Sequence, residues 1–395
     1  MRKHFEPTRY REEADFRILG GCGLAGFIDR SGRRVPGDDI VRSMACMDER
    51  TNGLGAGYAA YNLFPELPDH FAFQLMYASE AARTATESFL REAFEIAKAE
   101  PIPIREIEEI DDAPLLWRYF AIPREEQLER SELSAEDFVV RAVMHINRDI
   151  DGAYVISSGR NMAGFKAKAF PTDVARFYRL DEYEASIWIG HGRFPTNTPG
   201  WWGGAHPFCL LEFSIVHNGE ISSYGINKRY LESHGYYCTL GTDTEVLAYV
   251  YDLLVRKHGL PLELACKVVA PPFWTDIESM DPEEAELMTT LRRVYGSASA
   301  NGPFAIIVGF GSGMLALNDR IKLRPLVAAE HGDVVYVASE EAAIRVICPN
   351  PDRVWRPQAG EPVIARYYSE DPAGSRALRP DQHPTRTTEE GEVAA

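Results

Sequence analysis

Cysteine is sparse and scattered in this sequence, with no C-x-x-C pair. The six cysteines are Cys22, Cys46, Cys209, Cys238, Cys266 and Cys348. A domain held together by disulfides carries a denser set, so we expect a reducing, cytoplasmic environment. Structural zinc ligands also come in closer pairs than these, and we expect no metal site.

Long apolar runs and clusters of basic residues are missing as well. No apolar stretch reaches the length of a membrane span, and residues 1–21 are charged throughout, without the apolar core of a signal peptide. Lys and Arg number 42 against 59 Asp and Glu, a formal charge of −17. A nucleic-acid surface needs clustered positive charge, so neither a membrane nor a nucleic acid is an expected partner.

What is present is a chain of ordinary globular composition. Its 395 residues, 45% of them hydrophobic, suffice for one large domain or two smaller ones. Apolar patterns predict strands near 16–29, 53–62, 71–77, 152–157 and 185–191, and successive strands over 302–339. Helices are predicted over 79–99, 135–147 and 276–295, whereas the acidic, Pro-interrupted stretch 100–133 is predicted to be irregular. This mixture indicates an α+β fold with antiparallel sheets.

Two helix starts have a local signature. Ser134 precedes Asp137 by three residues, and Thr242 precedes Glu245 by three, each just before an apolar run. A hydroxyl at the N-cap accepts a hydrogen bond from the backbone N–H three residues later, so helices should begin at both places.

Four short motifs in a fixed order carry the evidence for function. They are Cys22–Gly26 (CGLAG), His191–Thr196 (HGRFPT), Ala205–Pro207 (AHP) followed by His217–Ile221 (HNGEI), and Thr242–Glu245 (TDTE). A fifth, weaker match comprises Leu317–Arg320 (LNDR), Arg324–Leu326 (RPL) and Ala338–Glu340 (ASE). Each alone is short enough to arise by chance, but their joint order is a strong signal.

In these motifs the chain resembles the class-II, N-terminal-nucleophile glutamine amidotransferases. The resemblance runs from Cys22 to about residue 365 and implies a four-layer αββα sandwich, with two antiparallel sheets between helices. The segment Met47–Gly57 is similar to the one that follows the nucleophile strand in the amidotransferase domain of glutamate synthase. The whole chain looks like the stand-alone, archaeal-type form of that domain.

The resemblance implies that Cys22 is the nucleophile and forms a thioester with the substrate. In this family the nucleophile is the first residue of the mature chain, and its own α-amine, with an ordinary pKa of about 7.7–8.0, accepts the proton. Cys22 is internal here, so residues 1–21 are expected to be a leader that is removed after Gly21. The alternative is a buried strand cysteine that acts as a small hydrophobe.

The remaining predicted site residues match the family's binding positions. Arg193 would bind the α-carboxylate of glutamine, unless it forms a surface ion pair. Asp243 would bind the α-ammonium group, unless it only complements a helix dipole. Asn218 and Gly219 would donate to the oxyanion of the tetrahedral intermediate. Asn-Gly is also a common sequence in a tight hairpin turn, and the pair could form such a turn and still supply the oxyanion donors.

Several neighbours are assigned supporting roles. Phe194 and Thr196 are expected to line the glutamine pocket, and His206 and His217 to support it. A zinc site made of His206, Cys209 and His217 is disfavoured, because the terminal amine is the base in the family. Trp201 and Trp202 lie in a Gly-rich loop between two of the motifs. They either form part of a lid that excludes water or are packed against the fold.

We therefore expect a leader at 1–21, an amidotransferase domain at 22–368 with an inserted segment at about 79–185, and a disordered tail at 369–395. The predicted reaction is hydrolysis of L-glutamine to glutamate and ammonia. No cofactor is expected in this chain; FMN and an Fe–S cluster are expected in a partner synthase subunit that receives the ammonia, with glutamate synthase preferred. Homo- or hetero-oligomers are both possible. The alternatives are another small-metabolite acceptor, a non-catalytic glutamine-binding regulatory subunit, and an amidase with a different acyl substrate.

Overall fold

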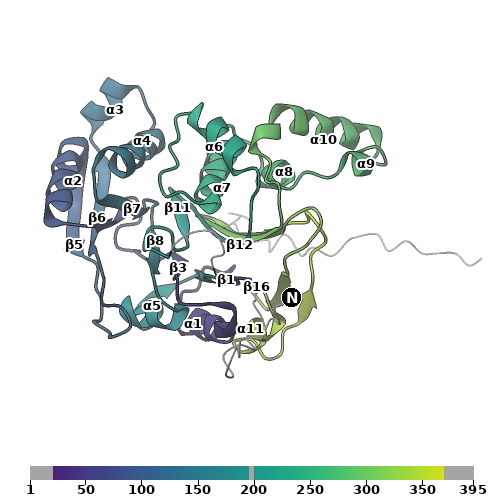
Figure 1. Ribbon diagram of the computed structural model, residues 1–395, viewed down its shortest axis with the longest axis horizontal. Coiled ribbons are helices and arrows are strands. Elements are labelled where there is room, and N and C mark those ends of the chain that lie inside the picture. Colours follow the sequence, from purple (N-terminus) through teal and green to yellow (C-terminus); the bar gives the residue numbers. More distant parts are fainter. Residues whose placement is uncertain (1–20, 195–199, 369–395) are drawn as a thin grey trace, which may run out of the picture.

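The computed structural model describes residues 21–194 and 200–368. Two sheets lie face to face, with helices on both outer faces (Figure 1). The upper helices in that view include α6, α7, α8 and α10, and the lower ones are α1, α5 and α11. This arrangement is the four-layer αββα sandwich of the N-terminal-nucleophile hydrolases, and the predicted fold class is confirmed.

The first sheet has seven strands and contains the strand that follows Cys22. Its strands, in spatial order, are β17 (Arg353–Trp355), β15 (Val327–His331), β16 (Val334–Ala338), β1 (Gly23–Asp29), β10 (Ile187–Gly192), β3 (Ala56–Tyr61) and β8 (Met162–Ala167). All neighbouring pairs are antiparallel. The helices that cover its outer face are α1 (Asp38–Ala45), α5 (Pro171–Phe177) and α11 (Glu341–Arg345). β1 is therefore an interior strand, held by backbone hydrogen bonds on both sides.

The second sheet has five strands. In spatial order they are β11 (Phe208–Leu210), β12 (Phe213–Gly219), β13 (Phe304–Phe310), β14 (Gly313–Asn318) and β18 (Val363–Arg366). The helices on its side of the molecule are α6 (Tyr224–Glu232), α7 (Asp243–Tyr251), α8 (Leu262–Val269), α9 (Trp274–Ile277) and α10 (Pro282–Val294). A π-helical turn, η4 (Asp252–Lys257), continues α7.

The core between the sheets follows from the two-residue period of their strands. In β1, Leu24 and Ile28 belong to the intersheet cluster, together with Val216 of β12 and Ile307 of β13. Phe27, between them, packs instead in the cluster under α1 and α11. Alternate side chains of a strand point to opposite faces, so an apolar run such as β1 can serve both layers.

The segment 79–185 contributes most of a third sheet at one side of the sandwich. That sheet is β5 (Phe94–Pro101), β6 (Leu115–Pro123), β4 (Phe71–Tyr77) and β7 (Ala153–Ser157), with α2 (Glu80–Ala93), α3 (Glu125–Ser131) and α4 (Ala135–Asp149) beside it. The same segment supplies β8 to the seven-stranded sheet. Two expectations were wrong here: the helix from 79 ends at Ala93, and 100–133 contains a nine-residue strand and a helix.

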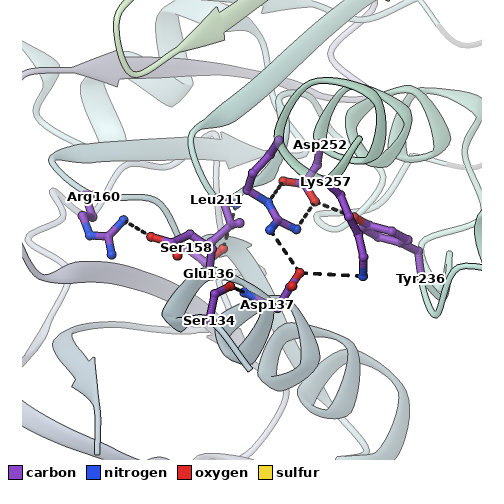
Figure 2. Close-up of polar contacts among 10 residues, drawn as sticks. Ser134, Glu136, Asp137, Ser158, Arg160, Leu211, Tyr236, Asp252 and Lys257 are labelled. Carbon is purple, nitrogen blue, oxygen red and sulfur yellow. Dashed lines mark hydrogen bonds and ion pairs between the residues drawn. The ribbon is translucent and has the colours of Figure 1, made fainter. Parts of the chain in front are cut away.

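Helix α4 is joined to the helical layer of the sandwich by charged pairs (Figure 2). Its Asp137 lies 3.0 Å from Arg256 Nη1 and 3.7 Å from Lys257 Nζ. Arg256 also binds Asp252, which accepts a hydrogen bond from the hydroxyl of Tyr236. Asp252 is fully buried, so this network ties the segment to the end of α7.

The remaining short elements are β2 (Val35–Pro36), β9 (Glu184–Ala185) and the 3-10 turns η2 (Asp48–Arg50), η3 (Leu180–Glu182) and η5 (Gly296–Ala298). Among the described residues, no helix is both long and apolar enough to cross a membrane. The expected tail at 369–395 and residues 1–20 of the expected leader lie outside the described residues.

Candidate active site

Cys22 lies at the start of β1, next to the end of β10. The register pairs Gly23 with Gly192, which brings Cys22 beside the residues that follow β10. The backbone N–H of Phe194 donates to Cys22 Sγ at 3.3 Å. Burial raises the pKa of the Cys22 thiol, and the Phe194 N–H and the Arg193 charge oppose this only in part. The thiol is therefore protonated in this state and needs a base before it can attack.

The residue before Cys22 also lies in the site. A Cβ on Gly21 would be 2.7 Å from Asn218 Oδ1 and 3.1 Å from Arg324 Nη1. On the other side, Arg50 Nε donates to the Cys22 carbonyl at 3.4 Å. Gly21 and Cys22 thus lie beside the side chains of Asn218, Arg324 and Arg50.

Arg193 follows β10 directly, and its side chain is buried. It is 5% exposed, so the alternative of a surface ion pair is wrong. Its backbone N–H donates to Gly55 O at 2.9 Å. Burial lowers the pKa of the guanidinium, while the nearby Cys22 and Asp243 oppose that effect. A buried guanidinium between a thiol and a carboxylate can bind an anion with two parallel hydrogen bonds.

Asn218 and Gly219 are the last two residues of β12, and the strand ends close to Gly21. Asn218 is 1% exposed, and its Nδ2 has no hydrogen-bond partner among the described residues. Gly219 lies opposite Phe304 in the sheet. The N–H of Phe304 donates to the Asp319 carboxylate, and the C=O of Phe304 accepts from the Asp319 N–H. Gly219 therefore occupies a non-hydrogen-bonded position, with its N–H pointing away from β13.

The chain after Gly219 does not return as a second strand. It leads through a turn into α6, so a simple hairpin at Asn218-Gly219 was the wrong reading. Gly219 has φ +147°, and a Cβ there would lie 2.0 Å from Pro303 O. Glycine is required because of this close approach.

Asp243 is the first residue of α7. Thr242 is the N-cap, and its hydroxyl accepts from the N–H of Glu245 as predicted. Asp243 Oδ2 accepts from Ile221 N at 2.9 Å, and Oδ1 lies 3.6 Å from His217 Nδ1. Burial raises the pKa of this carboxyl, but His217 and these hydrogen bonds outweigh it and leave the pKa below its ordinary value. The carboxylate stays charged and lies near enough to Arg193 to raise the pKa of that guanidinium against the effect of burial, so the two expected ligand groups are in the same region.

The histidines form a buried layer behind the site. His206 Nε2 and His217 Nδ1 lie 3.0 and 3.1 Å from Thr244 Oγ1, and His191 Nε2 lies 3.0 Å from the His217 carbonyl. The rings of His191 and His206 stack with centroids 3.9 Å apart. Burial lowers the pKa of His206 well below its ordinary value, so it is neutral. No group of three potential metal ligands occurs within the described ranges.

The structure thus brings together every predicted site residue that it describes: Cys22, Arg193, Phe194, His206, Asn218, Gly219 and Asp243. Thr196 lies outside the described residues. The sequence motifs assigned no role to Arg50 and included Arg324 only within a weak match. Nothing in the linear sequence separates these cations from ordinary surface ones.

The two tryptophans are packed. The Trp202 ring is 7% exposed, its Nε1 donates to Asp112 Oδ1 at 3.0 Å, and it meets Phe177 edge-on at 5.8 Å. Trp201 is partly buried and meets Tyr154 edge-on at 5.5 Å. Both rings therefore fasten their loop to the segment 79–185.

A cavity of about 530 Å³ lies away from these residues, between α4 and the stretch 234–237. Its wall includes Asp137, Tyr236 and Lys257, which Figure 2 shows in their network. None of the predicted site residues lines it, so it is separate from the Cys22 site.

Comparison with known proteins agrees with this geometry. The family model described as "Glutamine amidotransferases class-II" matches residues 108–360. An uncharacterized protein of Archaeoglobus fulgidus is 50% identical over 353 residues, covering 89% of this chain and 93% of that protein. A putative glutamine amidotransferase of Methanothermobacter thermautotrophicus is 26% identical, covering 82% of this chain and 93% of its own.

A more distant relative is the amidophosphoribosyltransferase of Methanocaldococcus jannaschii. It is 26% identical over 206 residues, which cover 51% of this chain and 38% of that protein. The family match extends over more than half of the chain, and the Cys22 site lies on the sandwich that the family implies. On these grounds the chain belongs to the class-II glutamine amidotransferases.

Proposed function

We propose that this chain, after removal of residues 1–21, hydrolyses L-glutamine to glutamate and ammonia through a Cys22 thioester. The observation that carries the proposal is the convergence at the start of β1. Cys22 Sγ accepts from Phe194 N, next to the buried Arg193. The side-chain amide of Asn218 lies beside Gly21, and its Nδ2 has no hydrogen-bond partner in the part of the chain that the structure describes. The Cys22 thiol, the Arg193 guanidinium and the side-chain amide of Asn218 therefore lie in the same part of the molecule.

Removal of the leader supplies the missing base. In the intact chain the Cys22 nitrogen is an amide and cannot accept a proton, whereas a terminal amine has a pKa of about 7.7–8.0. The amine takes the thiol proton, and sulfur attacks the side-chain amide carbon of glutamine. The carbonyl oxygen becomes an oxyanion that Asn218 Nδ2 and Gly219 N–H stabilise. The intermediate then expels ammonia, which takes the proton, and water hydrolyses the thioester to glutamate.

Substrate selection follows from the charges around this point. Arg193 binds the α-carboxylate of glutamine, and Asp243 binds its α-ammonium group. Phe194 and His206 would line the pocket between them, and the family resemblance assigns Thr196, which lies outside the described residues, to the same pocket. Two opposite fixed charges suit a free amino acid, which disfavours an amidase for neutral acyl substrates.

For the acceptor, we propose a synthase subunit of the glutamate synthase type, whose FMN and Fe–S cluster would reside in that subunit. The support is the likeness of Met47–Gly57 to the corresponding segment of glutamate synthase. Gly55 and Gly57 of this segment lie against Arg193 and the His206 carbonyl, so the segment borders two of the residues proposed to bind glutamine.

Intact-protein mass spectrometry tests the first part, with wild type beside Cys22→Ala. We expect wild type to begin at Cys22 and to release ammonia from glutamine, and Cys22→Ala to be inactive. Retention of residues 1–21 in protein from the native source would oppose the proposal and favour a non-catalytic glutamine-binding subunit.

Native co-purification tests the acceptor. We expect a flavin-containing partner and glutamate formation that depends on 2-oxoglutarate. Co-purification with a partner that aminates a different small metabolite would retain the glutaminase assignment and refute the glutamate synthase assignment.

A further inference from the structure

The loop Trp201–Pro207 forms one wall around the side chain of Arg193. A Cβ on Gly204 would lie 3.4 Å from Arg193 Nη1. From the other side, a Cβ on Gly55 would lie 3.2 Å from Arg193 Cδ and 3.3 Å from Ala205 Cβ. The Arg193 side chain is therefore packed between Gly55, just before β3, and this loop, so the position of the loop bears on that of the guanidinium.

Lys166 of β8 binds this loop at two points. Its Nζ donates to Gly203 O at 3.0 Å and to Pro207 O at 3.4 Å. These carbonyls flank Gly204 and His206, so one ammonium group fixes both ends of the stretch that contacts Arg193. The same ammonium lies 4.6 Å from the centroid of the Phe208 ring.

The burial of Lys166 is unusual for a lysine. The residue is 1% exposed, and burial lowers the pKa of its amine to about 8. Desolvating an ammonium group is costly unless hydrogen bonds compensate. A methionine or leucine would fill this place at lower cost, so the retained ammonium is best explained by the two carbonyls it fixes.

The other anchors of the loop come from the same part of the chain as Lys166. Asp112 accepts from Trp202 Nε1, and Tyr154 packs against Trp201. Together with Lys166 they belong to the segment 79–185, which also supplies the third sheet. The segment therefore holds a wall of the glutamine site through several independent contacts.

We propose that Lys166 is a positioning residue for glutamine recognition: it fixes the Trp201–Pro207 loop so that Arg193 is set to bind the substrate carboxylate. The inference rests on the proposed glutaminase function and deepens it. Among the described residues, the Lys166 amine contacts Gly203, Pro207 and Phe208 rather than the Cys22 thiol or Asn218, so its effect falls on substrate binding and leaves the chemical step unchanged.

The test is Lys166→Met in the processed enzyme, with Lys98→Met as control. Lys98 lies on β5 in the same segment, is half exposed and pairs with Glu100. We expect KM for glutamine to rise about tenfold in Lys166→Met with kcat within about threefold, and Lys98→Met to match wild type. Lys166→Arg, which keeps the charge and the donors, should recover part of the loss.

A second variant guards against misfolding of Lys166→Met. Trp202→Phe keeps an aromatic ring but removes the N–H that binds Asp112, and it should also raise KM. In the double variant the two effects should not add, because both act on one loop. Thermal unfolding and tryptophan emission report separately whether the fold and the loop are intact.

The outcomes separate this inference from the proposed function. Hydrolysis by wild type with an unchanged KM in Lys166→Met and Trp202→Phe would refute the positioning role alone, as would a loss of kcat without a change in KM. Absence of hydrolysis and of glutamine binding in processed wild type would refute the proposed function. Calorimetric titration of glutamine into Cys22→Ser chains that begin at residue 22 should give a Kd about tenfold weaker when Lys166→Met is added.

Discussion

Replacement of Asn218 by alanine separates catalysis from stability. Asn218 Nδ2 is buried and has no hydrogen-bond partner among the described residues, so its donor is unspent before the reaction. Loss of one oxyanion donor costs about 2.7–4 kcal/mol in the transition state, which is about a 10²–10³-fold fall in kcat. The donor is used only when the oxyanion forms, so KM should change little.

Asn227→Ala is the matched control. Both asparagines are 1% exposed. Asn227 Nδ2 donates to the carbonyls of Ser297 and Ser299, and its Oδ1 accepts from Ser223 Oγ. Three hydrogen bonds at about 1 kcal/mol each predict a loss of about 3 kcal/mol of folding free energy and a lower Tm, with kcat unchanged.

The assays are ammonia release and thermal unfolding on chains that begin at Cys22, which removes any effect on processing. We expect Asn218→Ala to lose kcat and keep its Tm, and Asn227→Ala to do the reverse. If Asn218→Ala kept its kcat, or lost as much Tm as Asn227→Ala, the amide would have a structural role and the oxyanion assignment would be incorrect.

Three further perturbations follow from the same contacts. Gly57→Ala would place a Cβ 2.2 Å from His206 O, so we expect about 1–3 kcal/mol of destabilisation and a raised KM, measured by thermal melts and kinetics. Asp243→Asn removes the proposed ammonium partner and should weaken glutamine binding at least about tenfold by calorimetry; unchanged affinity would contradict its role. Burial raises the pKa of Glu245 from 4.5 to about 7, so the folded protein keeps a proton that the unfolded chain releases. The unfolding free energy should therefore fall as pH rises from 4.5 to 7, and Glu245→Gln should flatten that slope in urea titrations.

Local chemistry was predictable where it depends on a few adjacent residues. Ser134 and Thr242 cap their helices as expected, since a side-chain hydroxyl and an N–H three residues away need no distant partner. The strand at 71–77 was also correct, because its residues are apolar apart from Gln74 and are buried on both faces. The fold class came from the resemblance, and the observed layers confirm it.

The errors fall where distant pairing decides the structure. Residues 94–101 (FEIAKAEP) contain helix-favouring Ala, Glu and Lys, yet they form β5 because β6 lies beside them. Strand propensity depends on such neighbours more than helix propensity does. The aromatic-rich stretch LLWRYFAIP of β6 was a usable signal that the surrounding prolines and acidic residues obscured.

Lys166 could not be identified for a related reason. Its importance comes from two carbonyls, at Gly203 and Pro207, that only the folded chain brings within reach of its amine. In sequence it is one lysine in an otherwise apolar strand, MAGFKA, and such a residue normally marks a solvent-facing position. The buried state of Arg193 was likewise invisible, since burial depends on the loop that covers it.

The position of Cys22 gives the proposed removal of residues 1–21 a physical consequence. β1 is bonded on one side to β10 and on the other to β16, so the strand that begins one residue later is fixed. Cleavage after Gly21 would therefore create an amine whose place is already set beside its own thiol. Before cleavage the same nitrogen is an amide, and burial keeps the pKa of the thiol raised. Under the proposed function, residues 1–21 would withhold the base, while Asn218 Nδ2, which has no hydrogen-bond partner among the described residues, is already in place.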